Sequence, residues 1–394
     1  MQPQPLPYDP LVLDAFVDLA GSRVWTARLA EIRVRAAAGP RAGRLLRQRH
    51  ALELAVERLR GGLSRPPSPA ELHAARLAGE AALLSRSLSA RGRRRLRENL
   101  RAGLQGDRSL VPLFHLLRTA ALERSRGFSV TFPGLERDAP YDLLIARGAS
   151  EAEVACEVVS ADQGRLVARD AWMQLADRVS DDVRTWLSAC PGSHLLKMTL
   201  PEGLQPDALA AMHARIRRLL EARRRQDHDR AGVLRLEPLV LARKQYETGL
   251  LNSLRSEFGP EAHLAVTAAE AGVFVMAARA GRIDEVGTAV HRHLLEIART
   301  RLSGGRRPGI LAMFIEDVGR ADWFGLRDSL SLEGEARRFL AHQAARHVVA
   351  VTCTSRFELF GMADAACEGE LRFRNPAHPA AKAVSLAPAI LSSV

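Results

Sequence analysis

Residues 140–161 read PYDLLIARGASEAEVACEVVSA and decide how the middle of the chain folds. Two apolar runs, 141–146 and 153–161, stand on either side of a glycine-containing turn, which predicts two consecutive β-strands. Asp142 opens the first of these strands, and Glu157 lies inside the second. A carboxylate within an apolar strand has to be ion-paired, bound to a cation or exposed on a solvent face. Glu157 therefore marks a candidate functional site.

The flanking sequence extends this pair of strands into an α-β-β-β-α-β order over roughly residues 108–200. A helix is predicted over 110–125, because its apolar residues recur with the period of a helix. A strand at 128–132 follows it, and a long helix at 168–188 and a fourth strand at 194–200 come after the quoted stretch. A crossover helix joins parallel strands, so we expect this fourth strand to lie beside the third.

Outside this region the sequence predicts helices before the core and a mixed sheet after it. We expect a basic, all-helical region at 1–107, a core at 108–260 and an α/β extension at 261–394, either separate from the core or continuous with it. Residues beyond about 380 are expected to be frayed. The fold class is α/β with a mixed sheet, since apolar strands alternate with helices. Later strands are predicted at 233–243, 309–316, 347–352 and 371–374 with a hairpin at 262–278, and helices at 206–226, 284–301 and 332–345.

The charge of the chain is strongly positive and unevenly distributed. The 394 residues carry a formal net charge of +12, and all but three of the 57 basic residues are arginine. Residues 1–107 hold 19 basic and 10 acidic side chains, whereas the remaining residues hold 38 and 35. An excess concentrated in one part of the chain predicts a polyanionic partner, and nucleic acid is the usual one.

Cysteine usage and hydropathy predict a cytoplasmic protein. The four cysteines, Cys156, Cys190, Cys353 and Cys367, fit neither a zinc-binding spacing nor a disulfide framework. The first ten residues lack the features of a secretory signal, and no run of 18 apolar residues exists, so we expect no membrane partner. No phosphate-binding loop or dinucleotide fingerprint is found. The oligomeric state is not indicated by the sequence.

The middle of the chain resembles the PD-(D/E)xK, or restriction-endonuclease-like, nuclease superfamily as a divergent member with an incomplete motif. Pro140-Tyr141-Asp142 is similar to the strand start that bears the family's Asp, and Glu157 to the acid of the third strand. The resemblance implies that Asp142 and Glu157 hold Mg²⁺ and that the protein hydrolyses phosphodiester bonds with its help. Val159 stands where the family has its lysine. The helical Glu of some members has a possible counterpart in Glu123.

The missing lysine leaves two interpretations. In the first, Lys197 on the predicted fourth strand replaces the motif lysine in catalysis, or Arg165 clamps a phosphate, which a guanidinium can do although it cannot act as a base. In the second, catalysis is lost and the fold binds nucleic acid, or serves as a catalytically inactive scaffold or protein-interaction module. Plainer roles are also open: Asp142 can simply begin a strand, and Glu157 can pair with Lys197 or face solvent.

Nucleic-acid binding is predicted mainly from the basic run at 91–97. It is the densest in the chain, and its arginines suit phosphate contacts, although the same pattern is typical of a solvated helix face. No aromatic residue is interleaved, so base stacking is not indicated. The candidate residues are Arg93, Arg94, Arg95 and Arg97, with Arg165 in addition.

Other charged clusters give weaker signals. The helix at 206–226 carries several arginines that can follow a phosphate backbone, and residues 227–229 (DHD) read as a polar turn. His291 and His293 do not share a helix face and do not suit a metal site. Glu316 and Asp317 end an apolar strand as a further acidic pair. We conclude that the sequence predicts a nucleic-acid-binding protein with a nuclease-like core, in which Mg²⁺-dependent hydrolysis is either retained or lost.

Overall fold

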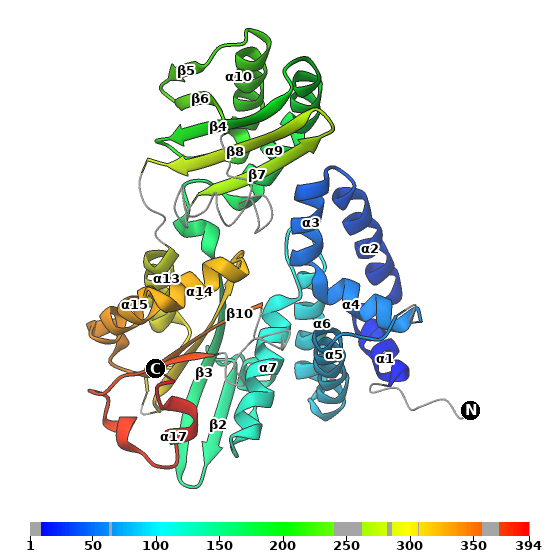
Figure 1. The fold of residues 1–394 in the computed structure, drawn as a ribbon. Coiled ribbons are helices and arrows are strands. Elements are labelled where there is room, and N and C mark those ends of the chain that lie inside the picture. The colour runs from blue at the N-terminus through cyan, green and yellow to red at the C-terminus, as the bar shows by residue number, and fades with distance from the viewer. Residues whose placement is uncertain are drawn as a thin grey trace. The chain divides into compact units, whose positions relative to one another are not determined.

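The computed structural model describes residues 9–62, 65–239, 262–281, 286–305, 307–356 and 370–393. The chain divides into two compact units (Figure 1). The first unit comprises Met1–Arg33, Arg49–Ala161 and Gly287–Val394, and the second comprises Val34–Gln48 and Asp162–Val286. This division differs from the boundaries expected after residues 107 and 260, because the second unit is inserted into the first.

The first unit contains a six-stranded mixed sheet in the order β1-β2-β3-β9-β10-β11. Strands β1 to β3 form an antiparallel meander, β9 runs parallel to both β3 and β10, and β11 closes the edge antiparallel to β10. β9 and β10 are buried over nearly their whole length, which explains why their sequences are continuously apolar. The mixed α/β class is thus confirmed. The strands are β1 (Ser129–Thr131), β2 (Leu143–Arg147), β3 (Ser150–Ser160), β9 (Gly309–Glu316), β10 (Val348–Ser355) and β11 (Leu371–Arg374).

The expected neighbour of β3 is wrong. The strand predicted at 194–200 is β4 (Gly192–Leu200), and it belongs to a different sheet. β9, preceded by α13 (Val286–Thr300), lies beside β3 instead, with Glu157 opposite Met313 in the register. The chain contains two helix–strand pairs with similar patterns, and the nearer pair folds into the second unit.

The second unit is built on a five-stranded sheet in the order β5-β6-β4-β8-β7. Apolar residues of α9 (Arg169–Ala189) and α10 (Leu209–Glu221) pack on this sheet, with Trp172 and Phe274 fully buried in the shared core. Residues 227–229, read as a turn from the sequence, belong instead to the short edge strand β5. The remaining strands are β5 (Gln226–Asp229), β6 (Gly232–Pro238), β7 (His263–Ala269) and β8 (Gly272–Ala280).

The N-terminal helices share a core with the sheet of the first unit. Phe16 of α1 meets Trp25 and Phe114 edge to face, with ring centroids 6.0 and 5.9 Å apart. The same cluster includes Ile390 near the C-terminus, so the expectation of frayed residues beyond 380 is wrong. Besides α9, α10 and α13, the described helices are α1 (Pro10–Ala20), α2 (Ser22–Ala36), α3 (Pro40–Arg49), α4 (Ala51–Arg60), α5 (Pro69–Ser87), α6 (Ala90–Gly103), α7 (Val111–Ser125), α8 (Pro133–Glu136), α14 (Arg320–Asp328), α15 (Ser331–Leu340) and α17 (Ala387–Ile390). Of these, α3 lies almost wholly in the second unit.

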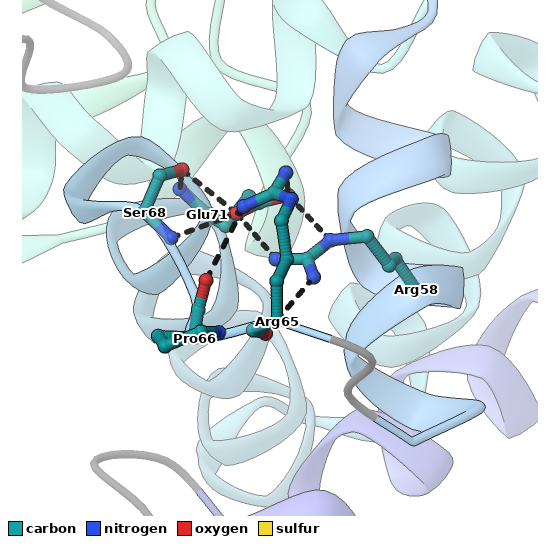
Figure 2. Close-up of polar contacts among 5 residues, drawn as sticks. All are labelled: Arg58, Arg65, Pro66, Ser68 and Glu71. Carbon is teal, nitrogen blue, oxygen red and sulfur yellow. Dashed lines mark hydrogen bonds and ion pairs between the residues drawn. The ribbon is translucent and has the colours of Figure 1, made fainter.

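A capping box fixes the start of α5, as Figure 2 shows. The Glu71 backbone N–H donates to the Ser68 hydroxyl, and the Ser68 backbone N–H donates to the Glu71 carboxylate at 2.8 Å. Arg58 of α4 and Arg65 also donate to this carboxylate. Burial would raise the pKa of Glu71, but the hydrogen bonds from Arg58 and Ser68 outweigh it and lower the pKa to about 2. Glu71 therefore joins two helices as well as capping one.

Replacing Glu71 by Ala should destabilise the protein by about 1–2 kcal/mol at pH 7, because the cap and the acceptor for Arg58 are lost together. Since the folded pKa is depressed, this contribution is present above pH 4.5 and disappears as the pH falls towards 2. Urea unfolding at pH 7 and at pH 3 measures it. Glu98→Ala is the control, since Glu98 is exposed and lies 3.7 Å from Arg94. An equal loss in both variants would contradict the role of the cap.

Candidate functional site

Asp142 is held at the start of β2 by the neighbouring strand. Its backbone N–H donates to the carbonyl oxygen of Val154, and its Oδ2 accepts a hydrogen bond of 2.8 Å from the backbone N–H of Cys156. The side chain is mostly buried. Asp142 therefore has a fixed position and does more than begin a strand.

Asp142 and Glu157 converge on one guanidinium, that of Arg301. Arg301 follows α13 directly, and its terminal nitrogen lies 3.0 and 2.9 Å from the two oxygens of Asp142. Its Nε lies 2.5 Å from Oε1 of Glu157. One cation thus bridges two acids that lie 15 positions apart in the sequence.

His293 of α13 adds an imidazole to the site. Its Nε2 lies 3.8 Å from Oε2 of Glu157, beyond hydrogen-bonding distance. This nitrogen is buried and has no hydrogen-bond partner among the described residues. The site therefore consists of two carboxylates, one guanidinium and one imidazole, and the two basic groups come from α13 and its end.

Burial and the Arg301 charge act in opposite directions on the two acids. Burial raises the pKa of Asp142, although Arg301 and the Cys156 N–H both favour its charged form. Burial also acts to raise the pKa of Glu157, but His293 and Arg301 outweigh it, so that pKa is lowered. Burial opposes the charge on Arg301, but the two carboxylates raise its pKa. Arg301 stays charged and compensates both acids.

The loop that carries Arg301 is anchored two residues later. Ser303 donates to the carboxylate of Glu153 twice, from its backbone N–H at 2.9 Å and from its hydroxyl at 2.5 Å. Glu153 is buried on β3, on the same strand as Glu157. The backbone N–H of Arg301 donates to the carbonyl oxygen of Ile297 at 2.8 Å, which completes the last turn of the helix. Arg301 is thus held from both sides.

These residues do not fit Mg²⁺ as they stand. Magnesium requires oxygen ligands in near-octahedral geometry, and the position between Asp142 and Glu157 is taken by the Arg301 guanidinium. Within the described residues, no group of three or more His, Cys, Asp or Glu side chains is arranged to hold a metal ion. Arg301 supplies the positive charge that the resemblance assigned to a metal.

Lys197 and Arg165 do not join this cluster as the sequence had suggested. Both belong to the second unit. Lys197 lies on β4, not on a strand next to β3, and its Nζ is 2.8 Å from Glu237. Arg165 is buried and pairs with Asp162 at 3.0 Å, so little of its guanidinium is exposed for a phosphate.

The basic run at 91–97 lies on α6. Arg93, Arg94 and Arg97 are exposed. Arg95 instead donates to the carbonyl oxygen of Gly134 at 3.0 Å and pairs with Asp138. The run therefore combines exposed arginines with one that attaches the helix to the segment leading to Asp142.

The remaining charged clusters have local partners. Arg215 of α10 is buried and pairs with Asp227 and Asp229, so it does not face a phosphate backbone. Burial and neighbouring Asp317 raise the pKa of Glu316 to about 7, against a hydrogen bond from Ser109. Asp317 itself pairs with Arg49 at 2.9 Å and accepts from the Ser160 hydroxyl at 2.6 Å. Glu123 pairs with Arg126 at 2.5 Å.

Sequence reasoning missed Arg301 and assigned no role to His293. A usable signal existed: the helix at 284–301 precedes the most continuously apolar strand, as expected for a crossover to a central strand. Placing that strand beside β3 would have brought the end of the helix close to Glu157.

No family model, curated protein or solved structure matches this chain. Among the described residues, no helix is long and apolar enough to cross a membrane.

Replacing Arg301 by Ala should destabilise the protein by about 2 kcal/mol at pH 7.5, because two largely buried carboxylates lose their counter-charge. The pKa values of both acids should then rise, so the folded variant takes up protons. A carboxyl group with a raised pKa stabilises the folded state at low pH, and this contribution is lost as the pH rises. The difference in free energy of unfolding between the variant and the unsubstituted protein should therefore be smaller at pH 5 than at pH 7.5. Urea unfolding at the two pH values tests this. Arg307→Ala, which removes an exposed arginine paired with Glu151, should show no such pH dependence.

Proposed function

We propose that this protein binds nucleic acid through a nuclease-like core in which Arg301 takes the place of the catalytic metal ion. The observation that carries the proposal is the convergence of Asp142 and Glu157 on Arg301. Two acids at the positions where the nuclease resemblance expects them are brought together by the fold, and a permanent cation compensates them. The guanidinium already binds both carboxylates, so the site has no place for Mg²⁺, and contacts to phosphate are assigned to exposed arginines outside it.

The element order of the first unit supports this proposal. If the short helix α8 and residues 162–286 are left aside, α7, β1, β2, β3, α13 and β9 have an order compatible with α-β-β-β-α-β. The last strand is parallel to β3, as expected for a strand reached through a helix. Residues 162–286 are then an insertion between β3 and α13, and the second unit also includes Val34–Gln48.

The attachment of α6 gives the proposal its electrostatic basis. Arg91 and Arg95 both pair with Asp138, and the Ser89 backbone N–H donates to Glu136 at 2.8 Å. Both acids lie on the segment that runs from α8 to Asp142. The exposed arginines of α6 are therefore on a helix fixed to the same segment as the carboxylate pair. Such a row attracts a phosphate backbone, and its contribution weakens with salt.

The unsubstituted protein should retard plasmid and single-stranded DNA in EDTA with an affinity of about 1–100 µM at physiological salt. Added Mg²⁺ or Mn²⁺ should produce no cutting, since Arg301 occupies the position between the carboxylates. Asp142→Ala and Glu157→Ala are assayed in parallel, and both should leave the product pattern unchanged.

Two results would contradict this expectation in different ways. Metal-dependent cutting that both substitutions abolish would establish an active nuclease from which Arg301 withdraws. If the protein neither retards DNA nor cuts it, the alternative is an inactive scaffold whose partner is a protein.

Replacing Arg93, Arg94 and Arg97 together by Ala should lower the affinity for duplex DNA and reduce the slope of log K against log salt by about 2–3. The matched control removes three exposed arginines that each have an acidic partner, Arg184, Arg307 and Arg337. A fall of equal size in the control would mean that net charge alone governs binding and that the α6 face has no special role.

A further inference from the structure

A cavity of about 410 Å³ lies in the first unit, beside the loop that carries Arg301. One side is formed by the end of α13 and the residues after it, including Arg299, Leu302 and Ser303. The other side is the connection between α15 and β10. The backbone N–H of Gly309 donates to the carbonyl oxygen of His347 at 2.7 Å, which joins the two sides at the start of β9.

The polar lining of this cavity consists mainly of hydrogen-bond donors. Arg299, His342, Arg346 and His347 line it, and no acidic side chain among the described residues does. Within the described part of the chain, neither Arg299 nor Arg346 has an acidic partner. Neighbouring arginines differ in this respect, since Arg307 pairs with Glu151. Two uncompensated guanidinium groups in one concave site favour an anion.

Local hydrogen bonds orient the two histidines. Nδ1 of His342 accepts from the backbone N–H of Ala344 at 3.0 Å, so in the neutral ring Nε2 carries the proton and can donate. Nε of Arg346 donates to Nε2 of His347 at 2.8 Å, which places the ring proton on Nδ1. That bond uses only one of the five N–H donors of Arg346. Each of the four side chains therefore retains a donor for a bound oxyanion.

We infer that this cavity, lined by Arg299, Arg346, His342 and His347, is a binding site for a phosphate group of nucleic acid. The inference rests on the proposed function, and it adds a second place of phosphate contact to the one offered by the exposed arginines of α6. The end of α13 and the residues after it serve both places. Arg299 and Ser303 line the cavity, and Arg301 between them bridges the carboxylates. A strand that enters the cavity thus lies next to the carboxylate pair. The phosphate is either internal to a strand or at its end.

The test compares two double variants that remove equal charge. Arg299→Ala with Arg346→Ala should weaken binding of single-stranded DNA at least 10-fold and lower the salt slope by about 1.4, since each lost phosphate contact contributes about 0.7. Arg307→Ala with Arg337→Ala removes two arginines that have acidic partners and should weaken binding less than 3-fold. Equal losses in the two variants would overturn the inference.

A linear oligonucleotide with and without terminal phosphates, and a circular single strand, distinguish the two sources of the phosphate. If the Arg299/Arg346 variant loses affinity only for the oligonucleotide with terminal phosphates, the site binds a terminal phosphate. If it also loses affinity for the circular strand, the site binds a phosphate of the backbone.

Inorganic phosphate tests the cavity separately from nucleic-acid binding. Phosphate at 10 mM should raise the melting temperature of the unsubstituted protein above that in chloride of equal ionic strength, because it binds the folded state. The rise should vanish in the Arg299/Arg346 variant and persist in the Arg307/Arg337 variant. If no nucleic acid is bound but this pattern holds, the proposed function fails and the anion site stands. If phosphate stabilises both variants equally, the site fails.

Discussion

The ion-paired contact of Arg301 with Asp142 and Glu157 is the constraint on which the first unit depends. Two carboxylates cannot both stay ionised in a largely buried place without a cation, because the cost of removing each charge from water is several kcal/mol. In the described part of the chain, the cation that lies between them is Arg301, more than 140 residues further along the sequence. The C-terminal end of α13 must therefore lie beside β3 for the two ionised acids to be stable. The pairing of the strands and the ion pairs of Arg301 thus depend on each other.

The insertion of the second unit is compatible with this constraint because each unit has a core of its own. Trp172 and Phe274 belong to one apolar cluster, and Phe114 and Ile310 belong to another. An inserted segment that buries its own apolar surface needs only its two ends near each other. For residues 162–286 those ends are the C-terminal end of β3 and the start of α13. The parallel pairing of β3 with β9 fixes the position of both.

Local patterns predicted most of the secondary structure, and they failed where the answer depended on distant pairing. The strand at 309–316 was identified to the residue, and the hairpin at 262–278 was predicted correctly. The partner strand of β3 was predicted incorrectly. The reason is that two segments, α9 with β4 and α13 with β9, show the same pattern of a helix followed by an apolar strand. In the site, Asp142 and Glu157 stood out as acids in apolar surroundings. Arg301 is one of 54 arginines, so nothing in the composition of the chain distinguished it from the others.

An arginine and a lysine differ in what they can do beside a pair of carboxylates. A lysine amine can lose its proton when it is buried, and it can then assist a nucleophile. The guanidinium of Arg301 cannot, since its two acidic neighbours raise a pKa that is already far above neutrality. Arg301 offsets the charge of Asp142 and Glu157 in part, and it does not accept a proton. The His293 imidazole is the other basic group of the site, and its Nε2 lies 3.8 Å from Oε2 of Glu157. A guanidinium between the two carboxylates therefore balances charge without supplying a base.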